Sequence, residues 1–257
     1  MLSYRVIPCL LLSGGGLVKT FKFAKPKYVG DPINAVRIFN EKEVDELMVL
    51  DIDASKQGRG PDFDLVEQLA GECFMPLCYG GGIRTAEDAR TLFKLGVEKV
   101  ALQSAVFRTP SIVREIADHA GEQAVVVSVD VKRNWLGNPM LHSASGEKLP
   151  HKDWRDAVRN AVTLGAGEIL LNAVDRDGTL AGIDADLVRE ASEIADVPLI
   201  ATGGIGSLAD MAAAIRAGAS AVAAGAYFVF QGPHRAVLIT YPRYEELSDL
   251  WRSVSDT

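Results

Sequence analysis

The second half of this chain repeats the first half. Tyr79 to Ile83 reads Tyr-Gly-Gly-Gly-Ile, and Thr202 to Gly206 reads Thr-Gly-Gly-Ile-Gly. One constant spacing also pairs several other residues across the halves, namely Gly82 with Gly204, Thr85 with Ser207, Asp88 with Asp210, and Gly96 with Gly218. The chain is therefore expected to fold from two similar units.

Short apolar runs alternate along the chain with longer amphipathic segments. The expected strands are Val6 to Leu12, Leu47 to Ile52, Pro76 to Tyr79, Lys99 to Leu102, Val125 to Asp130, Glu168 to Asn172, Pro198 to Thr202 and Ala221 to Ala224. Helical patterns lie between them, such as Thr85 to Leu95 and Ser207 to Ala217, with Thr85 and Ser207 as N-caps and Gly218 as a terminator.

Strands that are apolar throughout, separated by helices, are typical of a parallel sheet. Eight such units in 257 residues favour a closed (β/α)8 TIM barrel built from two (β/α)4 halves. A doubly wound open sheet is the second interpretation. No linker or composition break divides the chain, so residues 1–257 are expected to form a single barrel domain. The Gly-, Ser- and Pro-rich segment from Arg133 to His151 is expected to be a long loop that includes a hairpin.

Composition excludes several classes of function. With 27 basic against 34 acidic residues and a net charge of −7, the chain lacks the basic face that nucleic acids or anionic membranes require. Cys9, Cys73 and Cys78 follow no metal-ligand spacing, so neither a metal nor another cofactor is expected. Met1 to Arg5 lacks a signal-peptide pattern and no apolar run could span a bilayer, which predicts a cytoplasmic protein with reduced thiols.

The two glycine-rich segments are candidates for phosphate binding. Each follows a strand and precedes a helix, where exposed backbone amides and the helix dipole favour an anion. About twenty residues after each lies a second loop of small residues, Gln103-Ser104 in one half and Gly225-Ala226 in the other. A single Gly-Gly pair would more simply be a tight turn. Two copies in register predict a ligand with a phosphate at each end.

Three groups of acidic residues are expected near the mouth of the barrel. Asp130 should stand at the end of the fifth strand, where barrel catalysis takes place. Its structural alternative is an N-cap or an ion pair with Lys132 or Arg133. Asp177, within the turn Asp175 to Thr179, is interpreted as a substrate contact. Asp51 and Asp53 follow the second strand, and Asp51 could simply orient neighbouring loops.

A basic loop follows the first strand. Ser13 to Gly30 contains three consecutive glycines and the lysines at positions 19, 22, 25 and 27. Such a loop could close over an anionic ligand. The alternative is a solvated, mobile loop, which is expected to describe at least half of those lysines.

Charged residues also occupy the starts of four strands. They are Arg5, Glu46, Lys99 and Glu168. The amino-terminal face of a barrel ordinarily serves stability rather than catalysis. Their alternating signs predict a ring of ion pairs at the barrel floor, either as a plug or as a gate.

These motifs resemble the cyclase subunit of imidazole glycerol phosphate synthase over nearly the whole chain, to about Phe230. The matching stretches are Arg5 to Leu10, Gly30 to Pro32, Leu50 to Ser55, Gly80 to Arg84, Gly165 to Leu171 and Asp175 to Thr179. The resemblance implies a (β/α)8 barrel whose amino-terminal face docks on a glutaminase subunit as a heterodimer. Ammonia released from glutamine then passes through the barrel to a bisphosphorylated ribonucleotide.

The resemblance also implies roles for individual residues. Arg5, Glu46, Lys99 and Glu168 match the charged gate of the family, and Lys19 matches its substrate-loop lysine. The residues that match its phosphate sites are Gly82, Gln103 and Ser104 for one, and Asp177, Gly178, Gly204, Gly225 and Ala226 for the other.

The departures from the family pattern concentrate at the chemistry. The family cyclises its substrate with two acids, at the ends of strands one and five, whereas this chain has Leu11 and Asp130 there. Leucine cannot transfer a proton, and loss of a general acid or base costs a factor of about 10² to 10⁴ in rate. Gln103, Ser104 and Ala226 stand where Asn, Thr and Ser are usual, and the segment after Phe228 is unlike the usual cyclase end.

The segments Ile7 to Leu12 and Gly232 to Ala236 look like a paralogous branch, the glycosyl amidation-associated cyclase-like proteins. That branch implies delivery of ammonia to a separate sugar amidotransferase in surface-polysaccharide biosynthesis. Two hypotheses follow, an ammonia-conducting subunit and a histidine-pathway cyclase with a rearranged site. A third, the sibling sugar isomerase of the histidine pathway, is weaker because it too needs an acid after strand one and lacks the charged gate.

Overall fold

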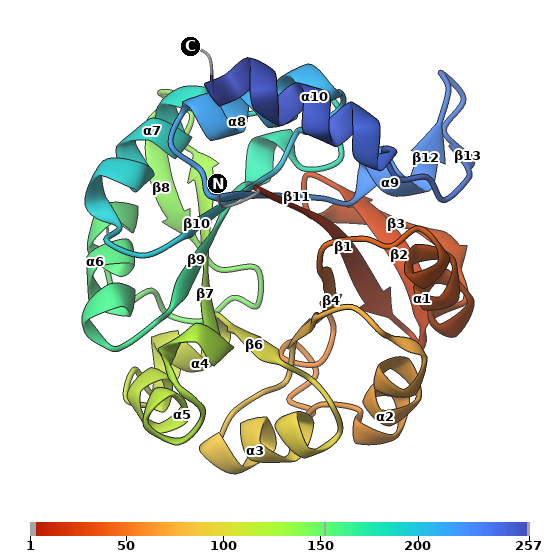
Figure 1. Ribbon diagram of the computed structural model, residues 1–257. Coiled ribbons are helices and arrows are strands. Elements are labelled where there is room, and N and C mark those ends of the chain that lie inside the picture. Colours follow the sequence, from red (N-terminus) through yellow and green to blue (C-terminus); the bar gives the residue numbers. More distant parts are fainter. Residues whose placement is uncertain (1–3, 152, 256–257) are drawn as a thin grey trace.

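A computed structural model describes residues 4–151 and 153–255 as a ring of strands enclosed by helices (Figure 1). Within the described part, eight parallel strands form the ring, namely β1 (Arg5–Ser13), β4 (Leu47–Asp51), β5 (Leu77–Gly80), β6 (Lys99–Leu102), β7 (Val125–Arg133), β9 (Glu168–Ala173), β10 (Leu199–Thr202) and β11 (Ala221–Ala224). β11 pairs with β1 in parallel, with Arg5 opposite Ala221, so the sheet closes on itself. The predicted (β/α)8 barrel is confirmed and the open sheet is excluded.

Helices cover the outside of the ring. Their bounds are α1 (Pro32–Glu41), α2 (Phe63–Glu72), α3 (Ala86–Lys94), α4 (Ser104–Arg108), α5 (Ile112–Ala120), α6 (Trp154–Thr163), α7 (Ala185–Ile194), α8 (Leu208–Arg216), α9 (Ala226–Val229) and α10 (Tyr244–Ser255). Short 3₁₀ turns lie at Glu122–Ala124 and Val174–Arg176. Among the residues described, no helix is long and apolar enough to cross a membrane.

Helices α3 and α8 begin in the same way, as the sequence repeat predicts. The Thr85 hydroxyl accepts the Asp88 amide at 3.1 Å, and the Asp88 carboxylate accepts the Thr85 amide at 3.0 Å. In the second half the Ser207 hydroxyl accepts the Asp210 amide at 3.2 Å, and the Asp210 carboxylate accepts the Gly206 amide at 3.0 Å. In each cap the hydroxyl satisfies an amide of the first helical turn, which has no partner within the helix, and the carboxylate satisfies an amide at or just before the start of the helix. The repeat in sequence is therefore a repeat in local structure.

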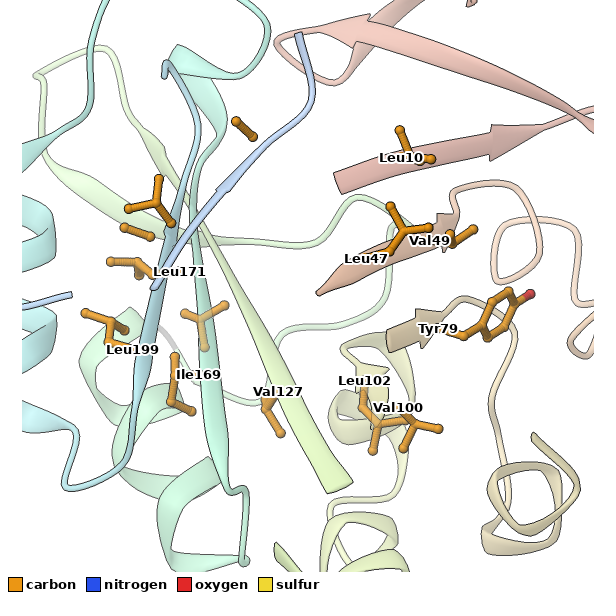
Figure 2. Close-up of a cluster of buried hydrophobic side chains, with 14 of the residues drawn as sticks. Leu10, Leu47, Val49, Tyr79, Val100, Leu102, Val127, Ile169, Leu171 and Leu199 are labelled. Atoms are coloured by element: carbon orange, nitrogen blue, oxygen red, sulfur yellow. The ribbon is translucent and has the colours of Figure 1, made fainter. Parts of the chain in front are cut away.

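The hydrophobic core has an outer and an inner part because side chains alternate across each strand. Outward side chains of the strands pack against the helices, and Figure 2 shows examples from β1, β4, β5, β6, β7, β9 and β10. Inward side chains form a separate cluster inside the barrel, consisting of Ile7, Met48, Cys78, Ala101, Val126, Leu170, Ile200, Ala221 and Ala223. The interior of the barrel is thus filled with apolar side chains, several of them small.

The segment after the first strand, which was expected to be a basic loop, is instead a β-hairpin. β2 (Gly16–Phe21) pairs antiparallel with β1, and β3 (Ala24–Gly30) pairs with β2. Gly14 and Gly15 both have positive φ in the two-residue turn, a conformation that glycine adopts without strain. Leu17 on β2 is 2% exposed, so its burial holds the hairpin against the barrel.

Two further hairpins depart from plain alternation of strands and helices. β7 extends beyond the predicted end at Asp130 to Arg133, and β8 (Pro139–His142) pairs with it, which confirms the hairpin expected between Arg133 and His151. Near the carboxyl terminus, β12 (Phe230–Gln231) pairs with β13 (Ala236–Val237). Met1 to Ser3, which carry most of the expectation about a signal peptide, lie outside the described residues.

Candidate functional site

A cavity of about 170 Å³ opens at the carboxyl ends of the barrel strands. This volume is large enough to hold a small organic ligand or several waters. The predicted site residues among its lining are Leu11, Lys19, Asp51, Gly82, Gln103, Ser104, Asp130, Asp177 and Gly225. Gly178, Gly204 and Ala226 lie outside the lining. The fold therefore brings residues from both halves of the chain to one site.

Asp130 projects from β7 into this cavity and is 4% exposed. Burial raises the pKa of its carboxyl to about 7, although hydrogen bonds from Gln103 and Ser128 oppose the shift. Neither Lys132 nor Arg133 forms an ion pair with it in the described part of the chain, and Arg133 pairs with Asp184 at 2.6 Å. A carboxyl that is half protonated near neutral pH is suited to donate or accept a proton.

The other two carboxylates in the lining have local partners. Asp51 accepts the backbone amides of Asp53 and Ala54, each at 2.9 Å, so it orients the loop after β4. Asp177 accepts Lys19 Nζ at 2.6 Å and the Thr20 hydroxyl at 2.9 Å. Of the three carboxylates among the described lining residues, Asp130 alone accepts no hydrogen bond from a cation or a backbone amide.

Leu11 lies on β1 at the same cavity. Its register places it opposite Leu50 of β4 and Val18 of β2. A leucine offers neither a proton nor an acceptor, so the β1 side of the cavity is apolar at this position while Asp130 projects from β7. The geometry supports acid–base chemistry by a single residue.

We expect Asp130→Asn to make stability less dependent on pH. An unfolded aspartate has a pKa near 3.9, so the stabilising contribution of the wild-type carboxyl is complete below that pH and is lost as the pH rises to about 7. Raising the pH from 5 to 8 should lower the free energy of unfolding of the wild type by about 2–3 kcal/mol more than that of the variant. Urea unfolding at both pH values measures it, with exposed Asp186→Asn as the control. Parallel pH profiles for the Asp130 variant and wild type would contradict the assignment.

The β2–β3 hairpin covers one side of the cavity. Lys19 is 6% exposed and packs its stem over Gly225, where an added Cβ would approach Lys19 Cδ at 3.1 Å. At the hairpin tip, Phe23 lines the cavity and its ring lies 6.2 Å from that of His142 on β8. Both tip residues, Lys22 and Phe23, have positive φ, a costly conformation for side chains of this size.

The glycines of the candidate phosphate loops are required by close packing. An added Cβ would lie 2.7 Å from the Gly60 carbonyl carbon at Gly82, and 2.1 Å from the Gly182 oxygen at Gly204. At Gly178 it would lie 2.3 Å from the Thr20 oxygen. These contacts support the tight-turn interpretation, and a phosphate role for the loops stays a prediction. The Ser104 hydroxyl forms a hydrogen bond of 2.7 Å with the hydroxyl of Ser145, which lies in the loop after β8.

Several polar residues of the cavity were not among the predicted site residues. Ser128 and Asn172 point inward in step with Asp130 and Glu168, so alternation along β7 and β9 could have identified them. The side-chain oxygen of Asn172 is buried and lacks a hydrogen-bond partner among the described residues. Thr20 and Ser145 carry no such signal, because their approach depends on how the hairpins fold back.

The four charged residues at the opposite end of the barrel form a closed ring. Glu46 accepts Arg5 at 2.5 Å and Lys99 at 2.9 Å, and Glu168 accepts the same two cations at 2.9 and 3.1 Å. Burial opposes the charge of Arg5, but the two carboxylates raise its pKa. The predicted alternation of signs is therefore a physical ring, and its use as a gate stays a prediction.

Comparison with known proteins identifies the family. The family model described as "Histidine biosynthesis protein" matches residues 5–233. The chain belongs to the histidine biosynthesis protein family. It is 52% identical over 96% of its length to the "Putative imidazole glycerol phosphate synthase subunit hisF2" of Pseudomonas aeruginosa, covering 99% of that protein. It is 50% identical to the hisF3 protein of Vibrio vulnificus, with 96% of this chain and 95% of that protein covered.

A third relative in the histidine biosynthesis protein family is less similar. The "Imidazole glycerol phosphate synthase subunit HisF" of Streptomyces coelicolor is 41% identical over 89% of this chain and 91% of its own length. The predicted resemblance to the synthase subunit is therefore confirmed at the level of the family. The roles of individual residues are not decided by these similarities.

Proposed function

We propose that this chain is the ammonia-conducting subunit of a glutamine amidotransferase complex and that it supplies a separate sugar amidotransferase. The observation that carries the proposal is Leu11 in the cavity. Asp130 remains there as a proton-transferring acid, but the position of its expected partner is apolar. Cyclisation that needs two acids loses one of them, whereas conduction of ammonia needs neither.

The ring of ion pairs supports a role in ammonia transfer. It closes the amino-terminal end of the barrel, where a glutaminase subunit would dock, and small side chains such as Ala101, Ala221 and Ala223 lie among those above it. Neutral ammonia can move along an apolar interior more readily than ammonium, because burying a charge without a partner is costly. The barrel axis thus leads from the proposed glutaminase face to the cavity.

Sequence similarity supports a branch that differs from the ordinary cyclase. Identity is 52% and 50% to the hisF2 and hisF3 proteins but 41% to the Streptomyces HisF protein. The acceptor we propose is an amidotransferase acting on a sugar of a surface polysaccharide, in the cytoplasm. This acceptor follows from the resemblance described above to the glycosyl amidation-associated branch.

A second candidate is the cyclase reaction itself. That enzyme would convert the bisphosphorylated ribonucleotide and ammonia to imidazole glycerol phosphate and an aminoimidazole carboxamide ribonucleotide. The pKa of Asp130 near 7 favours it, since one of the two acids is present and suitably tuned. Leu11 opposes it.

Nitrogen tracing tests the proposed function. The chain, a glutaminase subunit and a purified sugar amidotransferase are combined with glutamine labelled with heavy nitrogen in the amide, together with unlabelled ammonium. We expect the aminated sugar to carry mainly the heavy nitrogen, because conducted ammonia does not mix with bulk solvent. Omitting this chain is the control. Product nitrogen drawn from bulk ammonium in both mixtures would contradict the proposal.

A further inference from the structure

Two hairpins near the mouth of the barrel share an unusual composition. The segments 13–30 and 226–243 contain no aspartate or glutamate, in a chain with 34 acidic residues. They form the β2–β3 hairpin and the β12–β13 hairpin with its flanks. Both follow the carboxyl ends of barrel strands, β1 and β11, so they stand at the same end as the cavity.

The two hairpins contact each other. Lys27 Nζ donates to the Arg235 carbonyl at 3.1 Å and lies 5.0 Å from the centre of the Phe230 ring. The guanidinium of Arg235 lies 5.7 Å from the centre of the Phe21 ring. In Figure 1 β2 and β3 stand beside β12 and β13 at one side of the barrel. They therefore present one composite surface, which we call the hairpin face.

Four cations of the hairpin face have no carboxylate partner within the described part of the chain. Lys22, Lys25, Lys27 and Arg235 form no ion pair with any of the described residues, whereas Lys19, on the same hairpin, is paired with Asp177. Uncompensated cations on a protein of net charge −7 create a local positive potential that attracts negative surfaces.

Large apolar side chains are exposed among these cations. Tyr28 is 65% exposed, Leu238 is 56% exposed and Val237 is 45% exposed. Apolar side chains bordered by charge of one sign match a protein partner whose own apolar patch is bordered by carboxylates. A small anionic ligand would need the cations but would leave these apolar side chains in water.

A protective role explains part of this surface. β3 is the edge strand of the sheet, and lysine and proline on an edge strand prevent it from pairing with another chain. That role accounts for Lys25, Pro26 and Lys27. It does not account for Arg235 on the neighbouring hairpin, nor for the exposure of Leu238.

We infer that the hairpin face docks the ammonia-accepting enzyme through an acidic surface of that enzyme, an inference that rests on the proposed function. The ion-pair ring and the hairpin face lie at opposite ends of the barrel, so a glutaminase and an acceptor can bind together. Docking beside the cavity would hold the acceptor's active site at the exit for ammonia. The partner is thus an enzyme with a carboxylate-rich, partly apolar patch near its ammonia entrance.

Binding measurements test the inference directly. The full chain is immobilised, and its dissociation constant for the purified sugar amidotransferase is measured at several salt concentrations. We expect Lys25→Glu/Lys27→Glu to raise the dissociation constant about tenfold or more, since two attractions become repulsions. The control Arg90→Glu/Lys94→Glu makes the same change of net charge on α3 and should shift it by less than about twofold. Leu238→Asp is a second variant, for use if the double lysine variant fails to fold.

Several outcomes would overturn the inference. They are unchanged affinity in the folded hairpin-face variants, absence of wild-type binding, and an effect of equal size in the α3 control. The inference is also overturned if the hairpin-face variants abolish self-association of the chain, or its binding to phosphatidylglycerol vesicles, and not its binding to the amidotransferase. Nitrogen tracing separates the two proposals. If the acceptor docks normally but receives no heavy nitrogen, only the proposed function is contradicted. If variants that no longer bind the acceptor still transfer heavy nitrogen fully, only the role of the hairpin face is contradicted.

Discussion

Replacing Glu46 with alanine is expected to lower the free energy of unfolding by about 3–5 kcal/mol, because it removes one of the two carboxylates that neutralise a pair of partly buried cations. Glu46 is 2% exposed, and one of its oxygens accepts both Arg5 and Lys99. In the variant those two cations would share only Glu168. Denaturant unfolding of the purified chain measures the effect. The matched control is Glu87→Ala, which removes an exposed partner of Arg90 and should cost at most about 1 kcal/mol.

A variant with a fully apolar ring tests the stability of the barrel and the transfer of ammonia separately. Replacing Arg5 and Lys99 with methionine, and Glu46 and Glu168 with leucine, removes all four charges at similar volume. Such replacements are often neutral or stabilising, so most of the lost stability should return. If the ring is a gate, this variant should nevertheless fail to pass ammonia from the glutaminase. A stable apolar variant that still transfers heavy nitrogen would show that the ring is only a structural plug.

Restoring an acid at position 11 is expected to raise cyclase turnover by about 10² to 10⁴-fold, the range attributed to one general acid or base. Leu11→Asp places a carboxyl on β1 at the cavity that already contains Asp130. The assay follows formation of imidazole glycerol phosphate from the bisphosphorylated ribonucleotide with ammonium salts, which removes dependence on the glutaminase. Burial should raise the pKa of the new carboxyl, as it does that of Asp130, so the gain should be largest near neutral pH.

Leu11→Asn is the matched control for this variant. Asparagine has the size and polarity of aspartate but cannot take up a proton, so it should leave turnover at the wild-type level. Equal gains in both variants would show that polarity, and not proton transfer, was missing. No gain in Leu11→Asp, with the ribonucleotide still bound, would mean that Leu11 is not what limits cyclisation.

The barrel and its helix caps were predictable because they depend on local patterns. Apolar strands separated by amphipathic helices leave few architectures, and the Thr85 and Ser207 caps need only residues three positions away. The ion-pair ring was predictable for a similar reason. Arg5, Lys99 and Glu168 each begin a barrel strand, so closure of the barrel brings their side chains together.

The hairpins were not predictable in the same way. Gly14 to Gly16 and the lysines that follow have the composition of a mobile loop, and only pairing with β1 converts the segment into strands. Contacts such as Phe23 with His142 and Arg235 with Phe21 join segments far apart in the sequence. They depend on how each hairpin bends over the barrel, which local propensity does not encode.

Cyclase turnover by the unmodified chain decides between ammonia conduction and cyclisation. The purified protein, alone with ammonium salts and then with its glutaminase subunit and glutamine, is given the bisphosphorylated ribonucleotide. We expect glutamine to be hydrolysed in the complex, while imidazole glycerol phosphate forms in neither mixture above the residual rate that remains when one of two acids is missing. Sustained formation of imidazole glycerol phosphate above that rate would contradict this expectation, because a barrel with Leu11 in its cavity would then be a cyclase.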